Sequence, residues 1–250
     1  MNKEEKLKEI LIYLKLTRLE KNLSNELRDA VVKNPSYLDF LLKIFSEEQA
    51  NKYERATARR IARARFPTLK TIDEFDFNHP EKIHKKLVVS LFDLRFIKDS
   101  ENVILLGPAG VGKSHLANAL GRSACAGGFS TRYTTAAELI NRLTTAFSDY
   151  SMARTLKYYT SPRLLVIDEL GYILIDKRGA EFIFQVVSHR YERGSIILTS
   201  NRAFRDWGKT FNDNTIASAI VDRLVHHSHV VKITGESYRI KNRKQKLKLN

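Results

Sequence analysis

The eight residues 107–114 constrain the fold more than any other part of this chain. They read Gly-Pro-Ala-Gly-Val-Gly-Lys-Ser and fill every fixed position of the pattern G-x-x-x-x-G-K-[ST]. The apolar residues 102–106 precede them, as expected of a buried strand, and residues 115–120 begin a helix. A strand, a glycine-rich loop and a helix in this order form a phosphate-binding P-loop. The sequence therefore predicts an α/β domain that binds a nucleoside triphosphate.

The residue types of this loop fit that chemistry. Glycines let consecutive backbone N–H groups surround an anion, and the N-terminus of the following helix adds partial positive charge. We expect Lys113 to reach the β- and γ-phosphates and the Ser114 hydroxyl to ligate Mg²⁺. A plain glycine-rich turn before a helix is the alternative, which the flanking elements disfavour. The predicted nucleotide-binding residues are Gly107, Pro108, Ala109, Gly110, Val111, Gly112, Lys113, Ser114 and His115.

A second apolar run, residues 163–167, ends in the carboxylates Asp168 and Glu169. Continuous Leu, Val and Ile is typical of a buried parallel strand, and ligands of such sheets lie beyond the carboxyl ends of the strands. We expect Asp168 to hold Mg²⁺ through its water shell, and Glu169, which faces the opposite way, to polarise the attacking water as a general base. A P-loop kinase needs no such base, so the pair favours hydrolysis. Two solvated acids at a strand end are the alternative.

A third apolar run, residues 195–200, ends at Asn201, which can orient the water from the far side of the γ-phosphate. A plain turn at the end of a strand is the alternative. Strand patterns alternate with helix patterns, which predicts a parallel sheet flanked by helices. A strand inserted between the P-loop strand and the Asp-Glu strand suits this order. The expected strands are 102–106, 130–134, 163–168, 195–200 and 230–233.

The first 65 residues show helical periodicity instead. Residues 34–36 interrupt it, Ser36 caps a short helix, and Ser46 with Gln49 caps a second helix that runs to Arg65. The predicted organisation is a small all-helical domain over 1–66, a nucleotide-hydrolysing domain over 67–240 and a basic tail over 241–250.

The net charge of +15 is concentrated in two segments. Residues 52–70 and 232–250 each carry seven basic side chains and one acidic side chain, whereas residues 1–51 carry nine of each. Concentrated charge of this kind indicates a footprint for a polyanion, with a solvated face as the alternative. We expect contacts to DNA phosphates without sequence readout. The candidate DNA-binding residues are Arg55, Arg59, Arg60, Arg63 and Arg65.

Cys125 is the single cysteine, so no internal disulfide can form and a reducing compartment is expected. The amino terminus lacks the apolar core of a signal peptide, and no apolar run reaches membrane-spanning length. The sequence therefore predicts a cytoplasmic protein that does not contact a membrane.

Three stretches, residues 107–117, 166–172 and 198–201, resemble the AAA+ ATPases of the initiator clade. Residues 66–77, 222–229 and 235–239 are more particular and resemble the IstB family, the transposition helper ATPases of bacterial insertion sequences, to which the helicase loader DnaC is related. The resemblance runs through essentially the whole chain. It implies a P-loop NTPase of the AAA+, additional-strand type, with a parallel sheet flanked by helices and a small N-terminal all-helical domain.

The resemblance also implies roles for single residues. Asn201 resembles the sensor residue, Arg223 the arginine finger that enters the nucleotide site of a neighbouring subunit, and Arg239 the second sensor arginine. The implied catalytic residues are Lys113, Glu169, Asn201, Arg223 and Arg239, and the implied metal ligands are Ser114 and Asp168. From the residues alone, an ion pair of Arg223 with Asp222 or Asp213 on a surface helix is the alternative.

The resemblance implies that the protein is an ATPase that converts ATP to ADP with Mg²⁺. It would form a homo-oligomer with ATP sites between subunits, bind and deform double-stranded DNA largely without sequence preference, and deliver that DNA to a partner transposase, which it stimulates. A DnaC-type helicase loader is the nearest alternative. A P-loop kinase and a nucleotide-gated DNA scaffold that hydrolyses little are two others.

Overall fold

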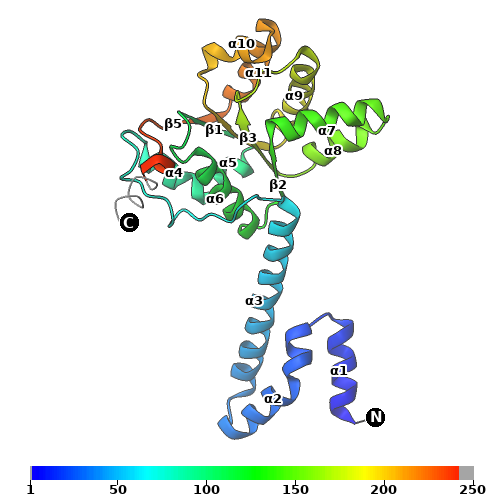
Figure 1. Cartoon of the computed structure of the whole chain (residues 1–250). Helices are drawn as coiled ribbons and strands as arrows, with labels where there is room; N and C mark the ends of the chain where they lie inside the picture. The colour runs from blue at the N-terminus through cyan, green and yellow to red at the C-terminus, as the bar shows by residue number, and fades with distance from the viewer. Residues whose placement is uncertain (1, 242–250) are drawn as a thin grey trace, which may run out of the picture. The chain divides into compact units, whose positions relative to one another are not determined.

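The structure is a computed structural model that describes residues 2–241, so the predicted basic tail lies, except for Lys241, outside the described residues. The chain divides into two compact units, one that ends at Arg59 and one that begins at Arg60. Figure 1 shows both units and labels most of their helices and strands. Within residues 2–241, no helix combines the length and the apolar character that crossing a bilayer requires.

The first unit is helical, and its apolar core is small. Four buried side chains form that core: Leu11, Leu19, Leu23 and Ile44. The buried carboxylate of Glu48 accepts the backbone N–H groups of Arg18, at 2.9 Å, and Leu19, at 2.8 Å. It thereby supplies acceptors for the free N–H groups at the start of the second helix. The helices are α1 (Lys3–Tyr13), α2 (Thr17–Lys33) and α3 (Tyr37–Ala64), the last of which continues into the second unit.

The predicted interruption near residue 35 is confirmed, but the predicted helix boundary at Ser46 is wrong. Asn34 ends α2 in a left-handed conformation, and the Ser36 hydroxyl accepts the N–H of Asp39 at 3.2 Å, as a cap does. Ser46 and Gln49, in contrast, lie inside the single helix α3. Serine is a moderate helix former, and no glycine or proline stands nearby to stop the helix.

The second unit contains a five-stranded parallel sheet with the strand order β2-β3-β4-β1-β5. The predicted strands are present, with ends that differ by one or two residues. The strand that separates the P-loop strand from the Asp-Glu strand is β4, which follows both in the chain, whereas β2 lies at the edge. The strands are β1 (Asn102–Leu106), β2 (Thr131–Thr135), β3 (Leu164–Leu170), β4 (Ser195–Ser200) and β5 (Ser228–Lys232).

Helices cover both faces of this sheet (Figure 1). A cluster of buried apolar side chains fills each interface. One face packs against α4 (Lys85–Ser90), η1 (Leu91–Asp93), α5 (Arg95–Lys98) and α6 (Lys113–Ala126). The other face packs against α7 (Ala136–Ser148), α8 (Met152–Thr160), α9 (Lys177–Arg190), η2 (Phe204–Asp206), α10 (Trp207–Phe211) and α11 (Asn214–Val225). The predicted α/β architecture is therefore confirmed.

Candidate nucleotide-binding site

The P-loop connects β1 to α6, as the sequence predicts. Gly110 and Gly112 have φ angles of 81° and 99°, in the left-handed region that favours glycine. A Cβ on Gly110 would lie 2.2 Å from Ser237 Oγ, and one on Gly112 would lie 2.5 Å from Phe75 Cε2. Both the backbone conformation and the close neighbours therefore favour glycine at these two positions.

Lys113 lies at the start of α6 and is only 4% exposed. Its ammonium donates to the carbonyls of Gly107, at 2.8 Å, and Pro108, at 2.7 Å. Burial lowers the pKa of Lys113 to about 8, although the charge of Asp168 acts in the opposite direction. The side chain is thus folded onto its own loop and forms no ion pair with a carboxylate of residues 2–241, whereas a phosphate would supply an anionic partner.

Asp168 is 2% exposed, and hydroxyl groups hold both of its carboxylate oxygens. Ser114 Oγ donates to Oδ1 at 3.0 Å, and the Thr199 hydroxyl donates to the same oxygen. The Tyr133 hydroxyl donates to Oδ2 at 2.6 Å. Burial and this hydrogen bond raise the pKa of Tyr133, so the phenol stays a donor. The structure brings Ser114 and Asp168 together, and their hard oxygen atoms fit a Mg²⁺ ion.

Glu169 follows at a β-bulge in β3. Between its pairings at Ile167 and Leu170, β3 carries one residue more than β4. Glu169 has a φ angle of 66°, which is unusual for a residue with a side chain. Its side chain is exposed while that of Asp168 is buried, so the two adjacent carboxylates lie in different surroundings. Glu169 lines the pocket beside the P-loop.

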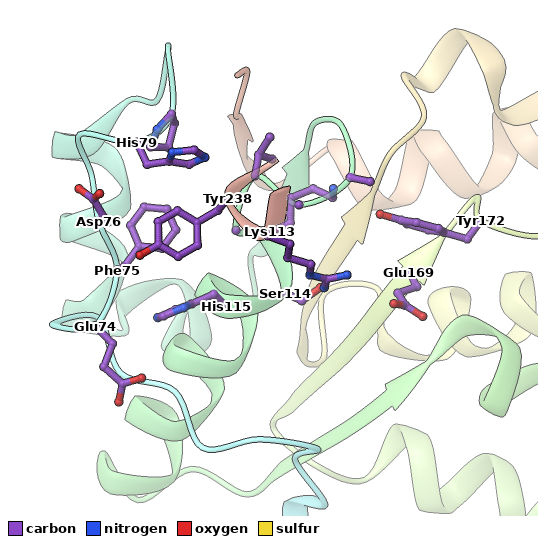
Figure 2. Close-up of a pocket in the computed structure, with 16 residues that line it drawn as sticks. Glu74, Phe75, Asp76, His79, Lys113, Ser114, His115, Glu169, Tyr172 and Tyr238 are labelled. Carbon is purple, nitrogen blue, oxygen red and sulfur yellow. The ribbon is translucent and has the colours of Figure 1, made fainter. Parts of the chain in front are cut away.

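A cavity of about 220 Å³ lies against the P-loop. Figure 2 shows Phe75, His79 and Tyr238 on one side of Lys113, with Glu169 and Tyr172 on the other side. Of the predicted site residues, Glu169, Arg239 and residues 109–115 line it. Gly107 and Pro108 are not among its lining residues and act through their carbonyls on Lys113. The lining residues that sequence reasoning missed are Glu74, Phe75, Asp76, His79, Pro80, Tyr172 and Tyr238.

Aromatic rings line the end of the cavity away from Glu169 (Figure 2). His79 packs edge to face against Tyr238, with ring centroids 4.8 Å apart, and Phe75 packs similarly against His115 at 5.4 Å. His79 Nε2 donates to the Glu236 carbonyl at 2.9 Å. These rings offer apolar faces and edges suited to a nucleobase. Two of the particular stretches in the sequence contain Phe75 and Tyr238, a signal that could have pointed to this end.

The two predicted sensor residues, Arg239 and Asn201, differ in whether they line the cavity. Arg239 lines it, and its charge also lowers the pKa of Lys113, after the larger effect of burial. The preceding residue, Tyr238, donates its backbone N–H to the Gly110 carbonyl at 3.0 Å and so fastens this segment to the P-loop. Asn201 directly follows β4 but does not line the cavity. Its Oδ1 atom is buried and has no hydrogen-bond partner among the described residues.

Arg223 lies on α11 and is not among the residues that line the cavity. Its guanidinium donates to the Ala219 carbonyl at 3.1 Å and lies 4.8 Å from the centre of the Phe184 ring. Within residues 2–241 it forms no ion pair with Asp222 or with Asp213, whose carboxylate instead caps α11 by accepting from the N–H of Ile216. The alternative ion pair is therefore absent among the described residues, and Arg223 is not among the residues that line the nucleotide pocket of its own chain.

The candidate DNA-binding arginines occupy the last turns of α3 and the residue after it. Arg55, Arg59, Arg63 and Arg65 are exposed, whereas Arg60 is partly buried and donates to the Cys125 carbonyl at 2.9 Å. Arg55 and Arg59 belong to the first compact unit, and the other three belong to the second. Four of the five side chains are thus accessible to an anion.

Comparison with known sequences gives a consistent result. Residues 10–246 match the family described as IstB-like ATP binding protein. The ATP-binding protein of insertion sequence IS21 from Pseudomonas aeruginosa is 40% identical over 236 residues, which cover 94% of this chain and 89% of the relative. That of insertion sequence IS5376 from Geobacillus stearothermophilus is 39% identical over 211 residues, which cover 84% of each chain.

Solved structures match the fold. AMPPCP-bound DnaA from Aquifex aeolicus aligns with a TM-score of 0.55 and 22% identity over 73% of this chain. This chain spans little more than half of that DnaA chain, at 56%. The DnaC helicase loader aligns with a TM-score of 0.50 and 20% identity, over 66% of this chain and 96% of its own. The predicted P-loop fold of the AAA+ type is confirmed by these neighbours.

Proposed function

This chain belongs to the family of IstB-like ATP-binding proteins, and on that premise we propose that it hydrolyses ATP to ADP and phosphate while assembled on double-stranded DNA. In this role it delivers target DNA to a partner transposase, which it stimulates. The single observation that carries the proposal is one pocket that combines the P-loop, Lys113 and Glu169 with the Ser114–Asp168 pair beside it. The names of the relatives, ATP-binding proteins of insertion sequences, support it.

Nucleotide binding is the first role of these residues. The backbone N–H groups of the P-loop hold the phosphates, and Lys113 exchanges its bonds to the Gly107 and Pro108 carbonyls for a charge-assisted bond to phosphate. Arg239 contacts the γ-phosphate from the same chain. Phe75 and Tyr238 pack against the base at the aromatic end of the cavity.

Water activation is the second role. Ser114 and Asp168 are the residues that would hold Mg²⁺, which when bound neutralises negative charge on the phosphates. Glu169 accepts the proton of the attacking water, because its exposed carboxylate faces the cavity. We assign the orientation of this water to Asn201, whose buried amide oxygen has no hydrogen-bond partner among the described residues and which would have to turn toward the cavity. A base at this position favours hydrolysis over transfer to a second substrate.

The third role belongs to a second protomer. Arg223 is outside the pocket of its own chain and pairs with no described carboxylate, so it is free to stabilise transition-state charge in a neighbouring site. We therefore propose a homo-oligomer with each ATP site between two subunits. The exposed arginines of α3 bind DNA phosphates in this assembly. A DnaC-type helicase loader shares the fold, but the insertion-sequence relatives favour transposition.

The direct test is sedimentation of the purified chain with ATP, with ADP or without nucleotide, each with and without a non-specific duplex, combined with phosphate release. We expect large complexes only when ATP and duplex are both present, and phosphate release that Lys113→Ala abolishes. A protein that stays monomeric while hydrolysing ATP would remove the shared site and favour a loader that awaits its helicase. No phosphate release under any condition would remove the hydrolase.

A further inference from the structure

The side-chain hydroxyl of Thr199, a fully buried residue of β4, touches both acidic residues of the nucleotide site. Its Oγ1 atom accepts the backbone N–H of Glu169 at 2.9 Å. The same hydroxyl donates to Asp168 Oδ1. A hydroxyl has one proton and two lone pairs, so it can make both bonds at once. Thr199 lies two residues before Asn201, and the sequence patterns gave it no role.

The bond from Glu169 explains how the bulge in β3 is stabilised. The extra residue of a bulge leaves the regular ladder, so its N–H loses the carbonyl partner that a parallel strand would offer. A buried N–H without a partner is costly. The Thr199 hydroxyl replaces the missing carbonyl and so allows Glu169 to keep its left-handed conformation, with φ at 66°. That conformation places the carboxylate of Glu169 on the cavity.

The bond to Asp168 fixes the second carboxylate. In the sheet, β3 lies between β2 and β4, and each neighbour contributes one hydroxyl. Thr199 of β4 donates to Oδ1, and Tyr133 of β2 donates to Oδ2 at 2.6 Å. Donors on opposite sides leave the carboxylate little freedom to rotate, and they keep Oδ1 next to Ser114 Oγ, at 3.0 Å. Outer partners of this kind commonly set the geometry of a metal ligand.

We propose that Thr199 is a positioning residue that sets the metal-holding carboxylate and the water-activating carboxylate together, whereas Tyr133 positions Asp168 alone. The inference rests on the proposed function, which assigns those two roles to Asp168 and Glu169. It concerns the hydroxyl rather than the methyl group of Thr199, so serine should replace threonine and valine should not. Valine has nearly the same shape but neither donates nor accepts a hydrogen bond.

The test compares Thr199→Val, Thr199→Ser and Tyr133→Phe with the wild-type protein. ATP hydrolysis is measured across a series of Mg²⁺ concentrations, and the binding of a fluorescent ATP analogue is measured in EDTA and across the same series. A matched control is Thr134→Val, which makes the same change in another buried strand residue. The Thr134 hydroxyl bonds to Thr135 and Glu138 and not to Asp168 or Glu169.

For Thr199→Val we expect about a 100-fold fall in kcat at saturating Mg²⁺ and about a tenfold rise in the Mg²⁺ concentration that half-saturates analogue binding. Thr199→Ser should restore both values to within about threefold of wild type, since it keeps the hydroxyl. Tyr133→Phe should shift only the Mg²⁺ requirement, so that raising Mg²⁺ recovers its activity. Analogue affinity in EDTA should stay the same in all three variants, because the P-loop is untouched.

Four results would overturn the inference. If the Thr199→Val variant keeps the wild-type kcat and Mg²⁺ requirement, the hydroxyl positions neither Asp168 nor Glu169. Thr199→Ser that behaves like Thr199→Val assigns the effect to the methyl group. Thr199→Val that loses analogue affinity in EDTA, or a Thr134→Val control with the same kinetic defect, assigns it to general damage of the fold. A wild-type protein that hydrolyses no ATP instead overturns the proposed function, and the Mg²⁺ dependence of analogue binding then decides the inference alone.

Discussion

Lys113 and Arg223 are both expected to face phosphate, yet their surroundings differ sharply. Lys113 lies in a cavity built from the P-loop, the end of β3 and two distant segments, and burial lowers its pKa to about 8. Arg223 lies on α11 outside that cavity and rests on the Phe184 ring. A single chain thus gathers the groups proposed to bind a nucleotide and to activate water in one cavity, whereas Arg223 lies outside that cavity. This difference is the structural reason to propose that a second protomer completes each site.

The largest effect that tests this difference is expected at Arg223. Arg223→Ala should lower kcat by about 10³-fold, because an arginine finger stabilises charge that develops only in the transition state. Analogue affinity should remain within about twofold, since the side chain lies outside the pocket of its own chain. Phosphate release and analogue titration measure the two quantities. An equal loss of affinity and turnover would place Arg223 in its own nucleotide site.

A slightly smaller effect is expected inside the cavity, at Glu169. Glu169→Gln should lower kcat by about 10² to 10³-fold, because the amide cannot accept the proton of the attacking water. ATP should still bind and hold the oligomer on DNA. Single-turnover hydrolysis and sedimentation with duplex and ATP measure these two properties. Wild-type turnover by this variant would assign the general base to another residue.

Lys113 should make nucleotide affinity depend on pH. Because its pKa is lowered to about 8 from the ordinary lysine value of 10.5, the free protein loses this proton as the pH rises through 8. The burial cost of the charge, present below pH 8, declines from there to pH 10.5, so this group makes the nucleotide-free fold more stable with rising pH. Phosphate restores the higher pKa, so ADP affinity should fall about tenfold from pH 7 to pH 9.

Fluorescence titration at several pH values measures this slope, with Lys113→Arg as the matched control. The guanidinium stays protonated over the whole range, so the variant should bind more weakly but with no slope of this origin. An equal slope in Lys113→Arg and in the wild-type protein would assign the pH dependence to another group.

The smallest expected change is in the salt dependence of DNA affinity, and it should leave the roles of Lys113 and Arg223 unaffected. Replacing Arg55, Arg59 and Arg63 by alanine should reduce the slope of log affinity against log salt by about 0.9 for each lost phosphate contact on B-DNA. ATP hydrolysis without DNA should stay unchanged. The control removes the same charge from exposed residues of the balanced segment: Lys3, Lys6 and Lys21. Equal slopes for the two triple variants would move the DNA footprint away from α3.

The sequence was sufficient to predict those parts of the site that consist of residues adjacent in the chain. The P-loop and the Asp168–Glu169 pair are local patterns at strand ends, so their place in the sheet follows from the order of the strands. Phe75 and Tyr238 reach the cavity through tertiary contacts, against Gly112 and Gly110, between segments far apart in the chain. No local pattern encodes such an approach.

The overlooked residue Thr199 and the wrong helix boundary at Ser46 have equally specific causes. The function of Thr199 depends on a bulge, which strict alternation along a strand does not predict. The boundary predicted at Ser46 failed because serine occurs both at helix caps and inside helices, and only the course of α3 distinguishes them. In both cases the outcome depends on the backbone hydrogen bonds of neighbouring residues, and the whole fold determines those bonds.

The claim that two protomers build each ATP site is tested most directly by mixing Arg223→Ala with Glu169→Gln protein on DNA and measuring phosphate release. Each variant alone lacks one essential group in every site. In a mixed assembly, a site with the intact Glu169 of one protomer and the intact Arg223 of its neighbour should be active. Random assembly at equal amounts should restore about a quarter of wild-type turnover. No recovery at any ratio, although sedimentation shows mixed assemblies, would contradict the shared site.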